Sequence, residues 1–362
     1  MNDPRFSRRR AVAGFASWLA ASPLLRGQQV SGEPPGRIAP PQELVNTFEF
    51  EAMAERKLAP PVFAAIAGGD RAAFDRITLR PRMMVNSLNL DLTAGLFGER
   101  LFAPILAGPA SEQKQFHPDG ELAMARGASA AKTLVVVSSR SSYPVEKIAA
   151  QSKGPWWYQD YPEGDAEAVR TRVQHAVDTG AKAVCITVGT PYQPAGAGGV
   201  PKPAHLVPMG NPGADWKLID RLRQGIRVPV LLKGIMTPEE ARTAVERGIQ
   251  GIVVSNHGGR FSTGLATPIE ALPSIVDAVG GRVPVLIDGS FRRGTDVIKG
   301  LALGARAVLV CRPSLWGLAA YGAEGVQAVL EMLQTELARD MAMCGKVTLQ
   351  SLDRSLVTIH QR

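Results

Sequence analysis

Residues 228–258 read VPVLLKGIMTPEEARTAVERGIQGIVVSNHG, and this stretch decides the fold class. Two short runs rich in Val, Ile and Leu flank a segment with helical signals. Thr237 suits the N-cap of a helix, Pro238 suits its first position, and two glutamates follow in the first turn. Gly248 stands where such a helix would end. Because both apolar runs are continuous rather than alternating, as in strands covered on both faces, the stretch predicts a β–α–β unit of a parallel sheet.

The same unit recurs along most of the chain. Strands are predicted at Leu101–Gly108, Thr133–Arg140, Trp156–Tyr161, Ala183–Gly189, Val228–Ile235, Gly251–Gly258, Val283–Ser290 and Ala307–Pro313. Helices are predicted at 118–131, 144–151, 165–179, 215–225, 237–248, 269–280, 294–303 and 321–340. Eight near-equal units favour an α/β fold of the (β/α)8 TIM barrel type over a doubly wound open sheet. We expect residues 43–100 to form a small helical segment that closes the bottom of the barrel and flanks the site.

The composition is that of a folded protein. Of the 362 residues, 45% are hydrophobic and 20% charged, which excludes wholesale disorder. Three cysteines are too few and too scattered for a disulfide framework or a zinc cluster, so no metal site is predicted. No apolar run approaches the ~20 residues of a membrane helix, so we expect no stable membrane span.

The N-terminus has the layout of a targeting signal. Residues 1–31 carry five arginines against one aspartate, and Arg8, Arg9 and Arg10 precede a weakly apolar stretch over 11–25. This pattern indicates a twin-arginine signal peptide and export, to the periplasm. A disordered basic arm and a retained anchor stay open as alternatives. The segment accounts for half of the formal net charge of +8, and the remaining charge is too dispersed to indicate nucleic acid.

The rest of the chain is predicted to consist of a linker, one domain and a tail. Residues 32–44 are predicted as a linker rich in Pro and Gly, 45–350 as the main domain with its barrel strands from 101 to 313, and 351–362 as a C-terminal tail. The Pro- and Gly-rich residues 189–213 are predicted as a loop over the site, with an insertion of no role as the alternative.

Polar residues crowd at the predicted strand ends, where such barrels carry their chemistry. After the seventh strand, Asp288–Gly294 places glycines and arginines before a helix start, and Arg312 follows the eighth strand. Loops of this kind bind phosphate, partly through free N–H groups at a helix N-terminus. The alternative is an ion-pair network of Asp288, Arg292 and Arg312 at the barrel rim.

Three side chains at neighbouring strand ends suit proton transfer and anion binding. His257 can accept a proton near neutral pH, Arg260 can hold a carboxylate through two parallel hydrogen bonds, and Lys233 can stabilise a developing negative charge. Taken singly, they would fit a buried histidine, a rim arginine and a snorkelling lysine. Their joint placement favours an active site.

Three motifs in barrel order resemble the FMN-dependent α-hydroxy-acid oxidase/dehydrogenase family, which includes glycolate oxidase and lactate dehydrogenases. They are SNHGGR at 255–260, DGSFRRGTD at 288–296 and HPDGE at 117–121, and the similarity covers roughly residues 45–350. The resemblance implies oxidation of a 2-hydroxy acid to a 2-oxo acid, with FMN as cofactor, an electron acceptor that stays open (oxygen, quinone or cytochrome) and a homo-oligomeric assembly.

The resemblance also implies roles for individual residues. His257 would be the base and Lys233 would stabilise the reduced flavin. Arg260 would bind the substrate carboxylate, and Tyr161 would place a hydroxyl near the substrate oxygen. Cofactor contacts are implied for Pro109, Ala110, Ser111, Ser138, Gln159, Thr187, Lys233, Ser255, Asp288, Gly289, Ser290, Arg292, Cys311 and Arg312.

The chain departs from the family pattern on the substrate side. Gly189 replaces an aspartate that pairs with the catalytic histidine, Ala65 replaces a substrate-binding tyrosine, and residues 192–199 lack the expected arginine. We expect His257 to be a weaker base for want of that carboxylate. Arg140, where relatives often carry an aromatic residue, and His205 are possible replacement groups. The alternative functions are a catalytically impaired FMN-binding protein and a barrel enzyme such as an isomerase that uses reduced flavin.

Overall fold

The computed structural model describes residues 36–82, 84–162, 165–189, 215–259 and 266–360. The chain divides into two compact units, Met1–Ala39 and Pro40–Arg362. Residues 36–39 of the first unit are described, and they form no helix or strand. The signal-peptide prediction, most of the predicted loop over the site, Arg260 and His205 lie outside the described residues.

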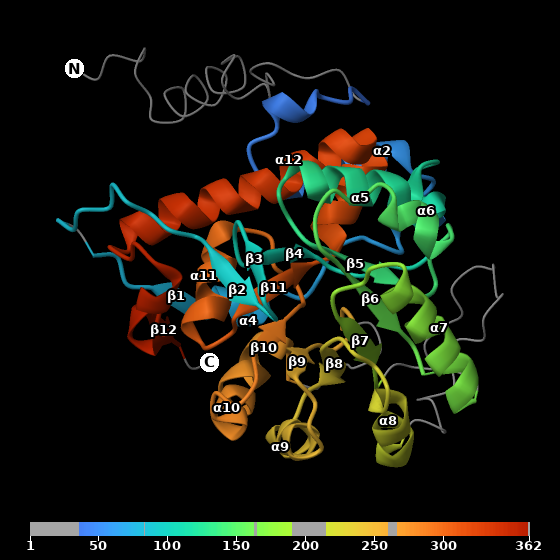
Figure 1. Cartoon of the computed structure of the whole chain (residues 1–362). Coiled ribbons are helices and arrows are strands. Elements are labelled where there is room, and N and C mark those ends of the chain that lie inside the picture. The colour runs from blue at the N-terminus through green and yellow to red at the C-terminus, as the bar shows by residue number, and fades with distance from the viewer. Residues whose placement is uncertain (1–35, 83, 163–164, 190–214, 260–265, 361–362) are drawn as a thin grey trace, which may run out of the picture. The chain divides into compact units, whose positions relative to one another are not determined.

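A closed barrel of eight parallel strands forms the centre of this unit (Figure 1), which confirms the predicted fold class. Around the barrel the order is β10-β11-β4-β5-β6-β7-β8-β9. The strands are β4 (Ile105–Ala107), β5 (Val135–Ser138), β6 (Trp156–Asp160), β7 (Val184–Thr187), β8 (Val230–Ile235), β9 (Gly251–Val254), β10 (Val285–Ile287) and β11 (Ala307–Val310). Each lies within its predicted range but is shorter at most C-terminal ends, because the polar residues there leave the sheet and form loops.

Helices follow the strands, and most lie within two residues of the predicted bounds. They are α5 (Gly120–Ala130), α6 (Val145–Ala149), α7 (Ala166–Asp178), α8 (Trp216–Arg223), α9 (Pro238–Glu246), α10 (Pro268–Val279) and α11 (Gly294–Ala302). Thr237 accepts a hydrogen bond from the Glu240 N–H at the start of α9, as its N-cap position predicts.

The last helix differs from its prediction. Helix α12 spans Arg312–Met343, so it begins directly after β11 rather than at residue 321. Pro313 stands in its first turn, where a proline is favoured. Gly322 interrupts the helix with φ 61° and ψ −137°, values outside the right-handed helical region. The predicted start at residue 321 is therefore wrong, and it lies beside this break rather than after β11.

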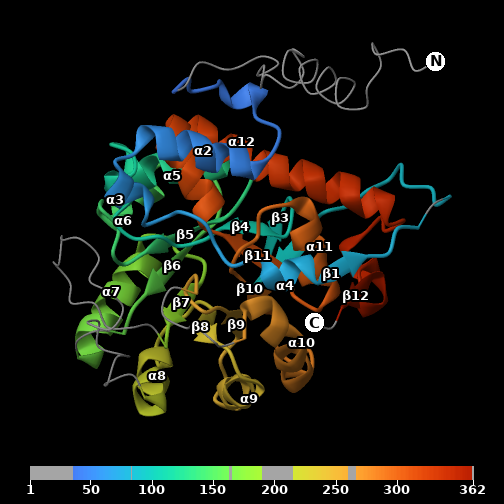
Figure 2. The same cartoon turned by 180° about the vertical axis from the view of Figure 1, so that it is seen from behind.

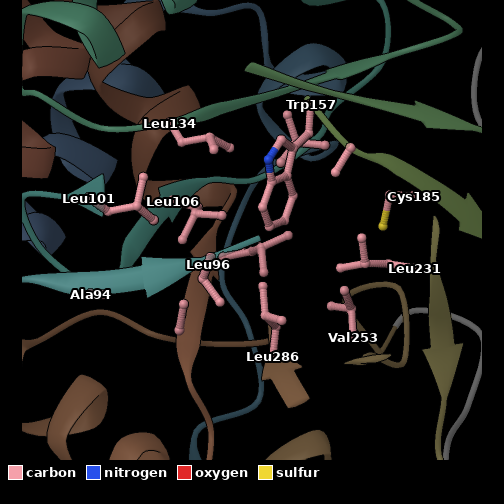
Figure 3. Close-up of a cluster of buried hydrophobic side chains, with 14 residues drawn as sticks. Ala94, Leu96, Leu101, Leu106, Leu134, Trp157, Cys185, Leu231, Val253 and Leu286 are labelled. Carbon is pink, nitrogen blue, oxygen red and sulfur yellow. The ribbon is translucent and has the colours of Figure 1, made fainter. Parts of the chain in front are cut away.

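A β-hairpin, not a helical cap, closes the bottom of the barrel. Strands β2 (Ala94–Leu96) and β3 (Glu99–Leu101) pair antiparallel, so Leu101 belongs to this hairpin rather than to the first barrel strand. Ala94, Leu96 and Leu101 pack with residues near the beginning of the barrel strands in one apolar cluster (Figure 3). The prediction of a helical closure was wrong because these three-residue strands are too short to show a clear alternation.

The N-terminal helical segment exists, but it flanks the barrel. It comprises α2 (Thr47–Lys57), α3 (Pro60–Phe63) and α4 (Ala72–Asp75), and α2 packs on α12 (Figures 1 and 2). The connection between α3 and α4 reaches the C-terminal ends of the barrel strands, where the Gly68 carbonyl accepts a hydrogen bond from Arg292. This segment therefore contributes to the site.

The C-terminal residues are paired with the N-terminal part of the unit. Strand β1 (Ile77–Leu79) pairs antiparallel with β12 (Val357–Ile359), within the region expected as a tail. Short 3-10 helices complete the structure at η1 (Pro41–Glu43), η2 (Gln113–Gln115), η4 (Leu349–Ser351) and η5 (Arg354–Leu356). Of the helices in the described residues, none has the length and apolar character needed to span a membrane.

Candidate functional site

A cavity of about 340 Å³ lies at the C-terminal ends of the barrel strands. The structure brings many of the predicted site residues to it, and they come from loops that are far apart in the sequence. The lining includes Pro109, Ser111, Tyr161, Lys233, His257, Asp288, Gly289, Ser290, Arg292, Cys311 and Arg312. Ala65, one of the positions that depart from the family pattern, also lines it.

The other predicted residues lie next to this lining. Ser138 Oγ is 3.4 Å from Ser111 Oγ, and Ser255 Oγ accepts a hydrogen bond from Lys233 Nζ at 2.9 Å. The Ala110 carbonyl accepts a hydrogen bond from Gln113 Nε2 at 3.2 Å. These contacts link the end of β4 to that of β5, and the end of β8 to that of β9.

A buried ion pair lies in the wall of the cavity. Lys233 Nζ is 2.8 Å from Asp288 Oδ2, and both side chains are nearly inaccessible to solvent. Burial alone would lower the pKa of Lys233, but the neighbouring groups, the Asp288 carboxylate first among them, together hold this pKa above its ordinary value. Lys233 is therefore a permanent positive charge in the cavity. Among the described residues Asp288 forms its ion pair with Lys233, so the alternative rim network with Arg292 and Arg312 is not the one observed.

Two buried oxygens in this region have no hydrogen-bond partner among the described residues. They are Gln159 Oε1 and Asp288 Oδ1. Gln159 Nε2 donates to Thr187 Oγ1 at 2.7 Å, which leaves the amide oxygen as the free end of the side chain. Because buried polar groups are normally paired, these oxygens point to a bound polar group that completes the site. A flavin ring, which carries both donors and acceptors on its edge, satisfies that requirement.

His257 lies in an unusual backbone conformation at the end of β9. Its φ of 54° is left-handed, a region that histidine adopts more readily than most side chains. The His257 N–H donates to Ser255 Oγ at 3.2 Å, and Nε2 lies 2.9 Å from the Val188 carbonyl oxygen. Because a carbonyl oxygen only accepts, this contact assigns the ring hydrogen to Nε2 and leaves the lone pair on Nδ1.

The Val188 carbonyl reaches His257 because the chain beside it is glycine. Gly234 has φ 111°, and a Cβ there would collide with the Val188 carbonyl and lie 2.9 Å from His257 Nε2. The Val188 N–H donates to the Lys233 carbonyl at 2.8 Å, which holds the two strand ends together. The sequence contains no signal for this backbone contact, since any residue at 188 would supply the same oxygen.

Burial determines the proton affinity of the imidazole. Together with the positive charge of Lys233, it lowers the pKa of His257 from 6.5 to about 4. Asp288 and the Val188 carbonyl oppose this shift without cancelling it. The imidazole is therefore neutral at pH 7, with Nδ1 able to accept a proton.

Two guanidinium groups converge on one point, as the phosphate prediction requires. Arg292 Nη2 and Arg312 Nη1 donate to the same Gly68 carbonyl, at 2.8 and 3.1 Å. Burial, followed by the charge of Arg312, lowers the pKa of Arg292 to about 10. A Cβ at Gly69 would lie 2.9 Å from both guanidinium groups, so only a glycine leaves this space clear. The contribution of residues 68–69 was missed because they lie far from the barrel in sequence.

The N-terminus of α11 does not offer the free N–H groups that were predicted for a phosphate. The N–H groups of Arg292 and Arg293 donate to Asp296 Oδ2, and that of Gly294 donates to Glu336 Oε2 at 2.7 Å. Both carboxylates are buried. This leaves the two guanidinium groups, rather than the end of α11, as the groups in this cavity that could hold an anion.

The HPDGE motif has a structural role at the rim. Glu121 Oε1 accepts hydrogen bonds from the backbone N–H groups of Gln113 and Ser142, at 2.9 and 3.0 Å. It therefore joins the loops after β4 and β5. In the loop after β5, the guanidinium carbon of Arg140 lies 4.2 Å from the centroid of the Tyr161 ring.

The residues present fit FMN. Two converging arginines match its phosphate, and the unpaired oxygen of Gln159, the Lys233 ammonium and the Ser255 hydroxyl match the polar edge of its ring. Among the described residues, no group of His, Cys, Asp and Glu side chains is placed to hold a metal ion.

Comparison with known proteins gives matches over most of the chain. The family model described as FMN-dependent dehydrogenase matches residues 65–198 and 193–359. Glycolate oxidase 3 of Arabidopsis thaliana is 36% identical over 351 residues, which are 86% of this chain and 95% of that protein. An L-lactate oxidase of Nostoc sp. is 37% identical over 356 residues, covering 86% and 98%.

Comparison with solved structures also gives matches over most of the chain. A mandelate oxidase crystal structure with (S)-2-phenylpropionate matches with a TM-score of 0.81 at 35% identity, covering 88% of this chain and all of that one. A flavocytochrome B2 variant matches with a TM-score of 0.82 at 28% identity, covering 89% and 88%.

Proposed function

Because this chain belongs to the FMN-dependent dehydrogenase family and oxidises 2-hydroxy acids with FMN as its cofactor, we propose that His257 is the base of the reaction. The observation that carries this proposal is the neutral imidazole of His257, which lines the same cavity as Lys233 and the two converging arginines. We assign the substrate carboxylate to Arg260 and the substrate hydroxyl to Tyr161, following the family motif.

Different residues account for the binding of the two ends of the cofactor. Arg292 and Arg312 would hold the phosphate of FMN together with the turn at Gly289 and Ser290, while Gln159, Lys233 and Ser255 would bind the edge of its ring. When bound, FMN accepts the two electrons that leave the alcohol carbon of the substrate. The fixed charge of Lys233 stabilises the negative charge that accumulates beside it.

The proton of the substrate alcohol passes to His257 Nδ1. The Val188 carbonyl holds the Nε2–H, so the ring stays in the tautomer that can accept a proton. It also stabilises the imidazolium that results, a role that the family pattern gives to the aspartate that Gly189 replaces. A carbonyl carries a partial charge rather than a full one, so this support is weaker than that of a carboxylate.

The names of the relatives do not favour the alternative of a catalytically impaired protein, since they are named as oxidases. The direct test is anaerobic mixing of flavin-loaded protein with a panel of 2-hydroxy acids, followed by flavin absorbance. We expect the yellow colour to bleach and the 2-oxo acid to form in equal amount. No bleaching with any member of the panel would refute the proposal, and product formation only after chemical reduction would support the isomerase.

The acid limb of the pH profile of kcat/KM is expected at an unusually low pH. A base must be unprotonated, and the pKa of His257 is lowered to about 4 by burial and by Lys233. We therefore expect kcat/KM to stay level from about pH 8 down to about pH 5, and to fall only as pH approaches 4. Flavin reduction measured by stopped flow across this range checks the prediction, and a limb near pH 6.5 would contradict it.

A carboxylate introduced at position 189 provides a second test of how nearby charge sets the pKa of His257. A Cβ at Gly189 would lie 4.0 Å from His257 Nε2. We expect Gly189→Asp to move the acid limb upward by about one to three pH units, because an adjacent negative charge favours imidazolium. Gly189→Asn is the matched control, since it has the same size and also tolerates the left-handed φ of 71°. Equal limbs in the two variants would contradict the electrostatic explanation.

We propose that residues 1–31 direct export and that the protein assembles as a homo-oligomer. The basic start and the apolar stretch after it support export. Expressing the full chain with Arg8→Lys and Arg9→Lys should abolish its appearance in the periplasmic fraction, and unchanged export would refute the proposal. Light scattering of the purified protein decides between oligomer and monomer.

A further inference from the structure

We propose that Arg71 is a positioning residue for the phosphate of FMN. Together with the rest of segment 47–71, which lies outside the barrel, it fixes residues 289–293, here called the phosphate loop. The inference rests on the proposed function, which assigns the phosphate to Arg292 and Arg312. It goes beyond that assignment, because Arg71 is not one of the described residues that line the cavity and acts through the loop.

The phosphate loop begins in a backbone conformation that needs support. Ser290 has a φ of 58°, in the left-handed region that serine adopts only uncommonly. Gly289 and Ser290 both line the cavity, so the course of the backbone here determines the shape of the phosphate end. A residue stays in such a conformation where the contacts around it hold it there. The contacts of Ser290 therefore matter to the site.

Arg71 binds the phosphate loop at its start and just beyond its end. Its Nη1 donates to the Ser290 carbonyl at 2.7 Å and to Asp296 Oδ2 at 2.8 Å. Its Nη2 donates to Asp296 Oδ1 at 3.1 Å. The Asp296 side chain is only 1% exposed, so this ion pair is nearly buried. One guanidinium thus joins the left-handed residue of the loop to the first turn of α11.

Asp296 and Thr47 extend this support to Arg292. Asp296 Oδ2 accepts hydrogen bonds from the N–H groups of Arg292 and Arg293, at 2.9 and 3.0 Å. The hydroxyl of Thr47, which is fully buried, donates to the Arg292 carbonyl at 2.6 Å. Both polar backbone groups of Arg292 are therefore bound, one by Thr47 and the other by the carboxylate that Arg71 holds. The Arg292 side chain consequently enters the cavity from a fixed position.

The surroundings of Arg71 strengthen its hold on the loop. Its guanidinium carbon lies 5.5 Å from the ring centroids of both Phe48 and Phe74, a distance at which a cation is attracted by a ring. The side chain is only 22% exposed. Because water screens a partly buried ion pair less than an exposed one, the bond to Asp296 is stronger than a surface ion pair.

The test compares FMN with riboflavin, which has the same ring but no phosphate. Each is titrated into the cofactor-free full chain, and binding is followed by flavin fluorescence. We expect Arg71→Leu to weaken FMN binding at least about tenfold and to leave riboflavin binding nearly unchanged, so the ratio of the two affinities falls. Arg71→Lys should keep part of the ratio, because it retains the charge but cannot bind Ser290 and both carboxylate oxygens together.

Two further variants sharpen the comparison. Thr47→Val removes one hydrogen bond to the Arg292 carbonyl while nearly keeping the shape of the side chain, and it should lower the ratio by about two- to tenfold. Arg247→Leu is the matched control, since Arg247 also pairs with a carboxylate, Asp220, and lies 5.4 Å from an aromatic ring, that of Trp216. We expect it to leave both affinities unchanged.

Release of FMN from the loaded protein gives a second readout. After dilution, the rise in flavin fluorescence measures the rate of release, which should increase in Arg71→Leu because affinity differences between related complexes lie mostly in dissociation. Circular dichroism shows whether each variant is folded. If the buried Asp296 carboxylate prevents folding of Arg71→Leu, then Arg71→Lys and Thr47→Val carry the same test.

The variant Arg312→Leu separates this inference from the proposed function. It removes a group assigned to the phosphate, so it should lower the ratio of FMN to riboflavin affinity. If Arg312→Leu lowers this ratio and the Arg71 and Thr47 variants do not, the inference is overturned and the phosphate assignment stands. Equal weakening of FMN and riboflavin by the Arg71 variants also overturns it. A ratio that Arg312→Leu leaves unchanged overturns the phosphate assignment, and the inference with it.

Discussion

Replacing His257 by Asn is expected to slow the reduction of bound flavin by a 2-hydroxy acid by about 10²- to 10⁴-fold. The amide has no lone pair of comparable basicity, so the alcohol proton has no acceptor at the position of Nδ1. Asn is the suitable replacement because it tolerates the left-handed φ of 54° at this residue. Stopped-flow absorbance under anaerobic conditions measures the rate directly.

FMN should remain bound in this variant, because the contacts assigned to the phosphate and to the edge of the ring come from other residues. His175→Asn is the control, since His175 lies exposed on α7 and pairs with Glu146. We expect its rate to equal that of the wild type. A His257→Asn enzyme that keeps its absorbance spectrum and reduces flavin within about tenfold of the wild-type rate would show that another group takes the proton.

Replacing Asp288 by Asn is expected to lower the free energy of unfolding by about 3–5 kcal/mol. The change leaves the buried Lys233 ammonium without its carboxylate, 2.8 Å away in the wild type. Since Asp288 is the main group that raises the pKa of Lys233 against the effect of burial, that pKa should fall when the carboxylate is lost. Urea unfolding of the cofactor-free protein, followed by circular dichroism, gives the free energy.

Two further variants isolate the buried pair. Asp277→Asn removes an exposed carboxylate that pairs with Arg354, and we expect no measurable change in stability. The double variant Lys233→Met/Asp288→Asn should be more stable than Asp288→Asn alone, because it leaves no unpaired charge in the interior. If the double variant were the less stable of the two, the cost would come from lost packing rather than from the uncompensated ammonium.

The barrel itself could be predicted because its strands are buried on both faces. Runs such as 230–232 and Gly251–Val254 are apolar throughout, and a polar residue follows each of them, Lys233 and Ser255. Since parallel strands place those ends at one edge, Lys233 and His257 had to lie near each other once the barrel was accepted. The kink at Gly322 and the hairpin at Ala94–Leu101 were not predicted, because a short strand or a helix break leaves a weak periodic signal.

The partners of the site residues could not be predicted in the same way. Asp288 was expected near the arginines but pairs with Lys233, and the N–H groups at the start of α11 are bound by Asp296 and Glu336. Such pairings depend on distances of a few tenths of an ångström between loops. Residue types alone therefore do not predict which side chains pair with each other.

The sequence and the tertiary structure determined different features of this protein. The pattern of apolar runs, glycines and polar strand ends in the sequence determined that a barrel forms and which side chains stand at its rim, because burial and backbone geometry act on residue types. Only the tertiary structure decided that the Val188 carbonyl holds the catalytic imidazole, that Gly68 lies between the two arginines, and that Arg140 rests on Tyr161. Backbone carbonyls are the same in every residue and stacking depends on how loops converge, so these contacts exist only once the chain has folded.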